Sequence, residues 1–312
     1  MSSRRSAWIS AGFGMASLAF AHQARAQACC AGAGALTPGR LQLHEDALVG
    51  TQLHAATVLG SFDDTAHYAK VSAHSSEVDY EEDLFGAVRV LRRGQVALLV
   101  PFVETHRNEL GLGEFGGGLG DVNLSARYDF IRSGESRYVP GLAVLTGLTA
   151  PTGNPPDDQN ANKPLGTNAT GIGAWQGNVG LAVEQTYGAW LVNVTELVAF
   201  RARRTADFAG VSESETLAPQ FVTLLGGAYT FDNDASVALF GSYTFEGTAT
   251  LNGAPAPDSA RRIALVSVSG AYPVTDHLRA QASVFVNPPI SGLGMNQTST
   301  TGLTLTILWG WS

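Results

Sequence analysis

Histidine and serine supply the side chains of this sequence that could perform acyl-transfer chemistry. Such a site needs a nucleophile, a base within hydrogen-bond reach and an orienting group. His67 and His74 lie near Asp63-Asp64 and Ser75-Ser76, but that stretch is polar and low in predicted structure. The sequence also has no G-x-S-x-G, H-E-x-x-H or phosphate-binding P-loop motif. These features favour solvent-exposed histidines, and we expect a protein that is not an enzyme.

The N-terminal residues have the composition of a secretory signal peptide. Arg4 and Arg5 are followed by an apolar stretch, residues 7–20, that is too short to span a bilayer as a helix. Two small-x-small cleavage sites lie within residues 24–28. We therefore predict a signal peptide over residues 1–28, removed after export across the inner membrane.

The two cysteines are adjacent in the predicted mature N-terminus. Neighbouring residues are too close for an ordinary disulfide between Cys29 and Cys30. Cys29 could carry a lipid if cleavage follows Ala28, but the preceding residues lack the leucine usual before a lipid-attached cysteine. An exposed thiol pair is the favoured interpretation. Two cysteines alone do not make a metal site, and we expect no metal and no cofactor.

Charge and hydropathy exclude two further classes of protein. The formal net charge is −8 and the only lysines are Lys70 and Lys163, so a nucleic-acid partner is not expected. No run of 18 apolar residues follows the signal peptide, which argues against a transmembrane helix.

The hydrophobic residues of the chain follow a period of two, which is typical of β-strands. In the last segment the bulky apolar residues from Leu303 to Trp311 alternate with threonine and glycine. The same reading gives twelve candidate strands: 48–61, 80–92, 95–107, 119–131, 138–149, 176–186, 190–202, 217–230, 235–248, 262–272, 278–287 and 302–311.

Short and long connections alternate strictly between these candidate strands. Tight turns on one side, long loops on the other and an even strand number are typical of membrane barrels. The predicted fold class is therefore all-β, a transmembrane antiparallel up-and-down β-barrel of about 12 strands over residues 48–312. Residues 29–47 are predicted to form a periplasmic N-terminal segment. The predicted location is the outer membrane of a Gram-negative-type bacterium, which implies contact with its lipids and with the barrel assembly machinery.

In such a barrel the apolar face of each strand contacts lipid and the polar face lines the lumen. The polar face supplies seven charged candidates for the lumen lining: Arg89, Asp121, Arg127, Asp129, Glu184, Arg201 and Arg279. Two strands are irregular. A bulge at Pro101 would turn Glu104 inward, and Glu196 falls on an apolar face without an explanation from the sequence.

Two glycine-rich stretches resemble motifs of a known family. Residues 116–128 resemble a "GLGD" motif followed by an alternating strand, and residues 148–153 with 164–167 resemble a "PTG … LGTG" loop. With the barrel pattern, this chain resembles the outer-membrane transporter family of the meta-pathway of phenol degradation. We expect Gly116 to Gly120 to adopt positive φ at the barrel rim and the longest loop, which contains Pro151, to fold over the mouth or into the lumen. The candidate rim residues are Gly116, Gly117, Gly118, Gly120, Pro151, Thr152 and Gly153.

The resemblance implies a channel or transporter that moves small, often hydrophobic or aromatic, compounds passively across the outer membrane. The alternative is a surface or structural barrel whose outer loops bind a partner. An outer-membrane hydrolase is the least favoured hypothesis, because no catalytic motif is found.

Overall fold

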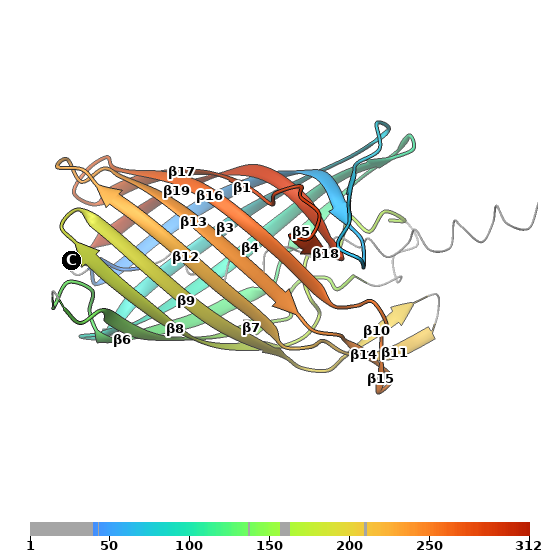
Figure 1. Cartoon of the computed structure of the whole chain (residues 1–312), viewed down its shortest axis with the longest axis horizontal. Helices are drawn as coiled ribbons and strands as arrows, with labels where there is room; N and C mark the ends of the chain where they lie inside the picture. Colours follow the sequence, from blue (N-terminus) through green and yellow to red (C-terminus); the bar gives the residue numbers. More distant parts are fainter. Residues whose placement is uncertain (1–39, 43, 137, 157–162, 209–210) are drawn as a thin grey trace, which may run out of the picture.

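The computed structural model describes residues 40–42, 44–136, 138–156, 163–208 and 211–312, which form strands and loops (Figure 1). Twelve long antiparallel strands make one closed wall, which confirms the predicted barrel. No helix among the described residues is long and apolar enough to cross a membrane. The wall strands are β1 (Ala47–Phe62), β3 (Ser75–Leu91), β4 (Gly94–Glu109), β6 (Val122–Ile131), β7 (Gly141–Ala150), β8 (Gln176–Tyr187), β9 (Trp190–Arg201), β12 (Gln220–Thr230), β13 (Ser236–Glu246), β16 (Arg261–Pro273), β17 (Leu278–Val286) and β19 (Gln297–Trp311).

The wall closes where the first strand meets the last. Strand β1 pairs with β19 from Ala47 opposite Trp311 to Phe62 opposite Gln297, so this seam is hydrogen-bonded along its length. All short connections lie at the barrel end where β1 begins and β19 ends, which we call the turn end. The long connections lie at the opposite end, which we call the loop end (Figure 1).

The loop end carries seven short strands that the sequence analysis does not predict. Strands β2 (Tyr68–Lys70), β5 (Leu112–Leu119) and β18 (Gly294–Met295) extend wall strands β1, β4 and β16. Strands β10 (Arg204–Phe208), β11 (Val211–Thr216), β14 (Thr250–Leu251) and β15 (Ala254–Pro255) form a separate small sheet beside the mouth (Figure 1).

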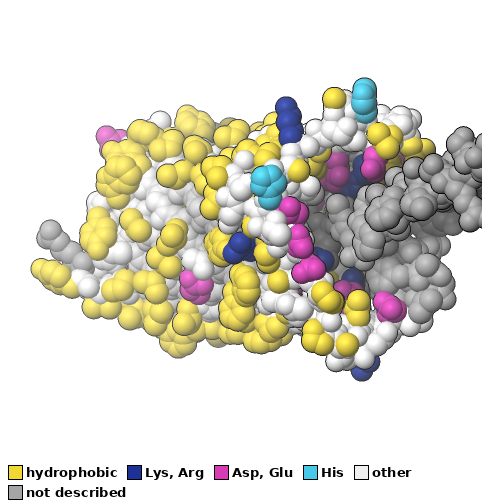
Figure 2. Space-filling model, turned by 45° about the vertical axis from the view of Figure 1, so that its right-hand side comes forward, with side chains coloured by type: hydrophobic (Ala, Val, Ile, Leu, Met, Phe, Trp, Pro, Cys, Tyr) yellow, Lys and Arg dark blue, Asp and Glu magenta, His cyan; other side chains and the backbone are white. Residues whose placement is uncertain are grey.

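Side chains alternate between the two faces of the wall as the sequence predicts. On β6, Leu124 is 48% exposed on the outside, whereas Asn123 and Ser125 are 7% and 8% exposed on the inside. The predicted apolar face of β19 is also on the outside, from Leu303 to Trp311. Hydrophobic side chains cover the outside of the wall, and many of the charged side chains lie toward the loop end (Figure 2). A closed barrel with an apolar outer belt is a transmembrane barrel.

Aromatic side chains gather on the outside at the turn end. The Trp190 and Tyr229 rings lie 4.9 Å apart, and Tyr229 and Phe231 lie 5.0 Å apart. On the C-terminal strand, the Trp309 ring stacks on His277 at 5.6 Å. Amphipathic rings at this position suit the boundary between lipid and water.

The bulge predicted at Pro101 is wrong. Strand β4 keeps an unbroken register with β3 through Pro101, so the faces do not exchange. On its other edge, β4 pairs with β6 over residues 94–99 and with β5 over residues 102–109, so the change of partner falls at Pro101. Glu104 therefore stays on the outer face, where its Oε1 lies 2.7 Å from His106 Nε2.

Glu196 also lies on the outer face of the wall. Its Oε2 accepts a hydrogen bond of 2.9 Å from the hydroxyl of Thr223, which is the residue paired with it on β12. A hydroxyl donor from the neighbouring strand gives this carboxyl a local partner.

Candidate functional site in the barrel lumen

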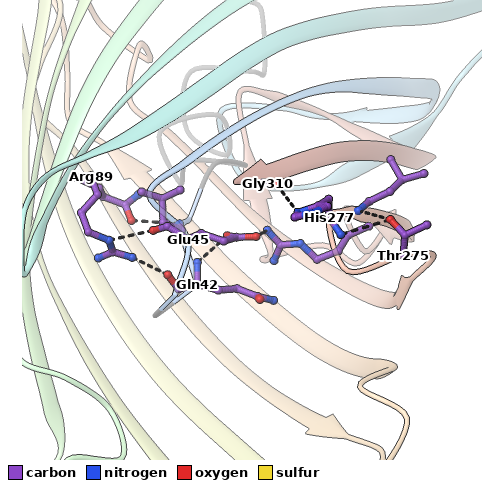
Figure 3. Close-up of polar contacts among 10 residues, drawn as sticks. Gln42, Glu45, Arg89, Thr275, His277 and Gly310 are labelled. Atoms are coloured by element: carbon purple, nitrogen blue, oxygen red, sulfur yellow. Dashed lines mark hydrogen bonds and ion pairs between the residues drawn. The ribbon is translucent and has the colours of Figure 1, made fainter. Parts of the chain in front are cut away.

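The chain before β1 turns back into the barrel, and we call its described residues 40–42 and 44–46 the strap. The strap begins its return with a tight turn in which the Glu45 amide donates to Gln42 O at 3.2 Å. The Gln42 amide in turn donates to Glu45 Oε2 at 2.8 Å. This turn sits inside the turn end, next to Gly310 and the start of β1 (Figure 3).

Two arginines of the wall hold the turn of the strap. Arg89 on β3 donates from Nε to Glu45 O at 2.9 Å and from Nη2 to Gln42 O at 2.5 Å (Figure 3). Arg279 on β17 donates to Glu45 Oε1 at 2.5 Å. Both arginines are predicted lumen candidates, and the structure places them against the strap from either side of β1 and β19.

Leu41 of the strap packs into a cluster of apolar side chains on the inner wall. It is 6% exposed, and its amide donates to Gln95 Oε1 at 3.1 Å. Burying such a side chain stabilises the strap by about 2 kcal/mol. The other members of this cluster are Leu48, Phe85, Ala87, Ala97, Leu99 and Leu308.

The strap ends at the far side of the lumen. Arg40 binds Glu184 on β8 through two hydrogen bonds of 2.8 and 2.7 Å. Strand β8 is five strands from β1 in one direction around the twelve-strand wall and seven in the other. The strap therefore crosses nearly the full diameter of the barrel near its turn end.

Glu184 also joins two other predicted lumen residues. Arg127 on β6 lies 3.2 Å from Glu184 Oε1 and 2.9 Å from Asp129 Oδ1. Arg40, Arg127, Glu184 and Asp129 thus form a charge-balanced network, as partly buried charges require.

A cavity of about 260 Å³ lies beside this network. Its wall carries amides, hydroxyls and one aromatic ring, so a small solute with hydrogen-bonding groups can be held there. The lining residues are Arg40, Gln95, Ala97, Ser125, Ala126, Arg127, Leu145, Thr146, Asn178, Glu184, Asn193, Thr195 and Phe240.

Arg201 lies at the other end of the lumen. Its Nη1 is 2.8 Å from Glu246 Oε2 on β13, and its Nε donates to Gln176 Oε1 at 2.9 Å. Next to it, Arg204 pairs with Glu215 of the small sheet at 2.5 Å. The first pair links wall strands β9 and β13, and the second links β10 and β11 within the small sheet.

Asp121 lies outside the lumen lining and holds a loop instead. It precedes β6, and its Oδ1 and Oδ2 accept hydrogen bonds from Gly153 N at 2.9 Å and Ile172 N at 2.6 Å. Burial raises the pKa of the Asp121 carboxyl, and these amides only partly offset that effect. The hydroxyl of Thr152 donates to Gly120 O at 2.6 Å. The two motif segments that carry the family resemblance therefore meet at the rim, Pro151 leading into the contact.

A second carboxylate holds the later part of the same loop. Glu114 on β5 accepts hydrogen bonds from Leu165 N at 2.9 Å and from the amide and hydroxyl of Thr167. Thr167 and Thr170 are 1% and 2% exposed. The loop between β7 and β8 is thereby packed over the β4–β5 hairpin.

Among the predicted rim glycines Gly116, Gly117, Gly118 and Gly120, only Gly118 has a positive φ, of 159°, which corrects the sequence prediction for the other three. Gly116, Gly117 and Gly118 lie in extended strand β5, and the left-handed residues are Leu110 and Gly111 in the preceding turn. Their role is close approach. A Cβ on Gly116 would lie 2.5 Å from Thr167 Oγ1, one on Gly117 2.3 Å from Val103 O, and one on Gly120 2.8 Å from Pro101 Cγ.

A row of acidic residues that is not among the predicted lumen candidates lies on the inner face of β3, and we call it the acidic strip. It consists of Glu77, Asp79, Glu81 and Asp83, at every second position. Glu77 pairs with Arg107 at 2.7 Å, Asp79 accepts from Thr105 Oγ1 at 2.8 Å, and Asp83 accepts from Gln52 at 3.4 Å. The alternation of acidic residues in E-V-D-Y-E-E-D is the sequence signal that identifies it.

The fold is similar to that of solved outer-membrane barrels. The COG4313 outer membrane channel from Pseudomonas putida F1 superposes with a TM-score of 0.71 and 18% identity, over 87% of this chain and 97% of that one. The translocator domain of the autotransporter NalP from Neisseria meningitidis gives 0.48 and 10%, over 89% and 91%. The P. putida toluene transporter TodX gives 0.40 and 11%, over 85% and 90%.

No protein-family model and no curated protein matches the sequence. The likeness at 18% identity shows the barrel fold alone. The resemblance to the meta-pathway family therefore stays a prediction, while the transmembrane barrel that it implied is confirmed.

Proposed function

We propose that this protein is a passive outer-membrane channel for small compounds. The turn end faces the periplasm and the loop end faces the outside, as expected for bacterial barrels with short periplasmic turns. No cofactor or metal takes part in this proposal. In the part of the chain that the structure describes, no group of three or more histidine, cysteine or acidic side chains could hold a metal ion.

The observation that carries the proposal is the polar inner wall around an open volume. A barrel with only a structural role would gain stability from an inner wall packed with apolar side chains. Here the lumen holds a cavity of about 260 Å³ that is lined by Asn178, Asn193, Thr195 and the Arg40–Glu184 pair. Such a lining suits small solutes with polar groups, and the single ring of Phe240 offers an aromatic contact.

The test is conductance of the mature protein refolded into planar bilayers, with barrel formation checked by heat-dependent gel mobility. Discrete current steps that small aromatic and polar solutes reduce support the channel. A folded, inserted barrel that passes neither ions nor solutes overturns the proposal and favours a barrel whose outer loops bind a partner.

A further inference from the structure

The charges of the lumen are balanced nearly everywhere except on the acidic strip. Arginines of the inner wall pair with Glu184, Asp129 and Glu246, and Arg279 pairs with Glu45 of the strap. Glu77 is likewise neutralised by Arg107. Asp79 and Asp83 differ, because the structure shows no ion pair for either among the described residues.

The neighbours of these two aspartates are uncharged on both sides. Asp79 lies between Ala56 on β1 and Thr105 on β4, and Asp83 lies between Gln52 and Pro101. Glu81, between them, adds a third carboxyl and interacts directly with Asp83. Alternate residues on a strand are about 7 Å apart, so the strip presents closely spaced negative charge along the lumen.

Asp83 gives a second and independent indication that the strip acts on cations. Its side chain points to the inner face and is only 4% exposed, and its Oδ1 has no hydrogen-bond partner among the described residues. An ionised carboxyl in this position is costly unless a counter-charge approaches it. The strands paired with β3 supply none at Asp83, so the offset must come from a proton shared with Glu81 or from a cation in the lumen.

We propose that the acidic strip makes the channel selective for small hydrated cations, such as potassium or ammonium ions, over anions. This inference rests on the proposed channel function. Rows of Asp and Glu side chains attract cations into pores in this manner. The carboxyls follow one strand and do not converge, so the strip raises the local cation concentration and does not form a tight metal site.

One opposing charge lies at the loop end of the lumen. Arg261 at the start of β16 has an Nη1 without a hydrogen-bond partner among the described residues, but it sits beside Glu246, its partner on β13, and near Glu215. Its charge is therefore locally offset. The arginine near Asp79 is Arg107, which is already paired with Glu77, and Asp83 lies opposite uncharged Gln52 and Pro101.

The test is the reversal potential of the refolded channel in a potassium chloride gradient at low ionic strength, where screening is weak. The native channel should prefer potassium over chloride by about twenty-fivefold, because two unit charges within about 8 Å of a passing ion in water enrich the cation about fivefold and deplete the anion about fivefold. The double variant Asp79→Asn, Asp83→Asn should bring this ratio close to one. Asparagine keeps the size of each side chain and removes the uncompensated charge, so the barrel should still fold.

The matched control removes two charges from the outer face. Glu82→Gln with Glu196→Gln changes the net charge of the protein equally, but both residues face away from the lumen, so the selectivity should stay native. A conducting native channel without cation preference overturns the inference and shows that the strip is held neutral by protons. The complete absence of current in all variants would instead count against the channel function itself.

Discussion

The two ends of the barrel are both covered from within the chain, but by different kinds of contact. At the turn end the strap is held mainly by arginine side chains, with Arg89 and Arg279 at its turn and Arg40 reaching the opposite wall. At the loop end the loop between β7 and β8 is held through its backbone amides, by Asp121 and Glu114. It also packs directly on glycine-rich β5.

This difference indicates which cover can move. Arg40 is 45% exposed on its side chain, and Glu184 keeps Arg127 as a partner when Arg40 leaves. Release of the loop would instead leave two carboxylates without their donors and would expose buried Thr167 and Thr170. Losing partners at buried polar groups costs about 1–3 kcal/mol each. We therefore expect the strap to be the movable cover and the loop to be the fixed one.

The largest expected loss of stability concerns the barrel wall, to which both the strap and the loop between β7 and β8 are attached. Leu239 on β13 is 57% exposed on the outer face. Leu239→Arg places a charge against lipid and should destabilise the inserted barrel by up to about 2–4 kcal/mol. The measurement is the urea dependence of refolding into lipid vesicles, followed by heat-dependent gel mobility.

Ser242→Arg on the inner face of the same strand is the matched control. An arginine there meets lumen water and should fold nearly as the native protein does. A silent Leu239→Arg together with a non-folding Ser242→Arg would reverse the assignment of the two faces, and with it the position of both covers.

The next effect concerns the fixed cover. Gly116→Val places a branched side chain where a Cβ alone would lie 2.5 Å from Thr167 Oγ1 and 2.7 Å from the Thr167 backbone. Overpacking of this kind costs about 1–3 kcal/mol, and it should detach the loop from β5. Limited proteolysis of folded protein should then cut between residues 151 and 175.

Gly113→Val tests whether the effect comes from contact with the loop. Gly113 lies on the same strand β5, but a Cβ there meets nothing within 4 Å. Equal protease sensitivity of both variants would mean that valine weakens β5 itself, and that Gly116 has no special role in seating the loop.

At the strap we expect a smaller loss of barrel stability but a larger change in channel conductance. Arg40→Ala removes a partly exposed ion pair of about 1 kcal/mol and leaves the Arg127–Glu184 contact in place. The Arg40 end of the described strap should leave the far wall, so single-channel conductance should rise while barrel stability stays close to native. Arg92→Ala, in the exposed turn between β3 and β4, is the control. Unchanged conductance in Arg40→Ala would show that the strap does not narrow the path.

The wall of the barrel was predictable from the sequence, because a period of two fixes both strand and face. The twelve predicted strands correspond to the twelve wall strands, and the outward side chains of β6, β13 and β19 are those that the alternation assigns. The acidic strip was visible in the same alternation. Its significance needed the pairing with β1 and β4, which places uncharged residues directly opposite Asp79 and Asp83.

Contacts between distant segments were not predictable. Nothing in the local pattern of residues 40–46 indicates that Arg40 meets Glu184, 144 residues away. The role of Gly116 depends on Thr167 in another loop, so a local argument assigned it to backbone conformation instead of close approach. The predicted bulge at Pro101 is wrong for a similar reason. Proline lacks a backbone N–H donor, and Pro101 lies where the partner of β4 changes from β6 to β5.

The smallest effect distinguishes the two carboxyls that hold the fixed cover. Burial acts to raise the pKa of Glu114, but hydrogen bonds from Thr167 and Leu165 outweigh it and lower this pKa. The stabilisation that the ionised Glu114 carboxylate gives the loop is present above the ordinary pKa of glutamate. It is lost as the pH falls through the lowered pKa of Glu114. Burial raises the pKa of Asp121. The stability contributed by the protonated Asp121 carboxyl is therefore fully present below the ordinary pKa of aspartate, and it is lost as the pH rises through the raised pKa.

Acidification from neutral pH to about pH 3 should therefore loosen one part of the loop and not the other. Amide hydrogen exchange, corrected for its intrinsic pH dependence, should show falling protection at Leu165 and Thr167, which bond to Glu114. Gly153 and Ile172, which bond to Asp121, should keep or gain protection. Glu114→Gln should abolish the loss at Leu165 and Thr167, because glutamine does not titrate. If all four amides lose protection together, the loop opens as one unit, and the two carboxyls do not hold it independently.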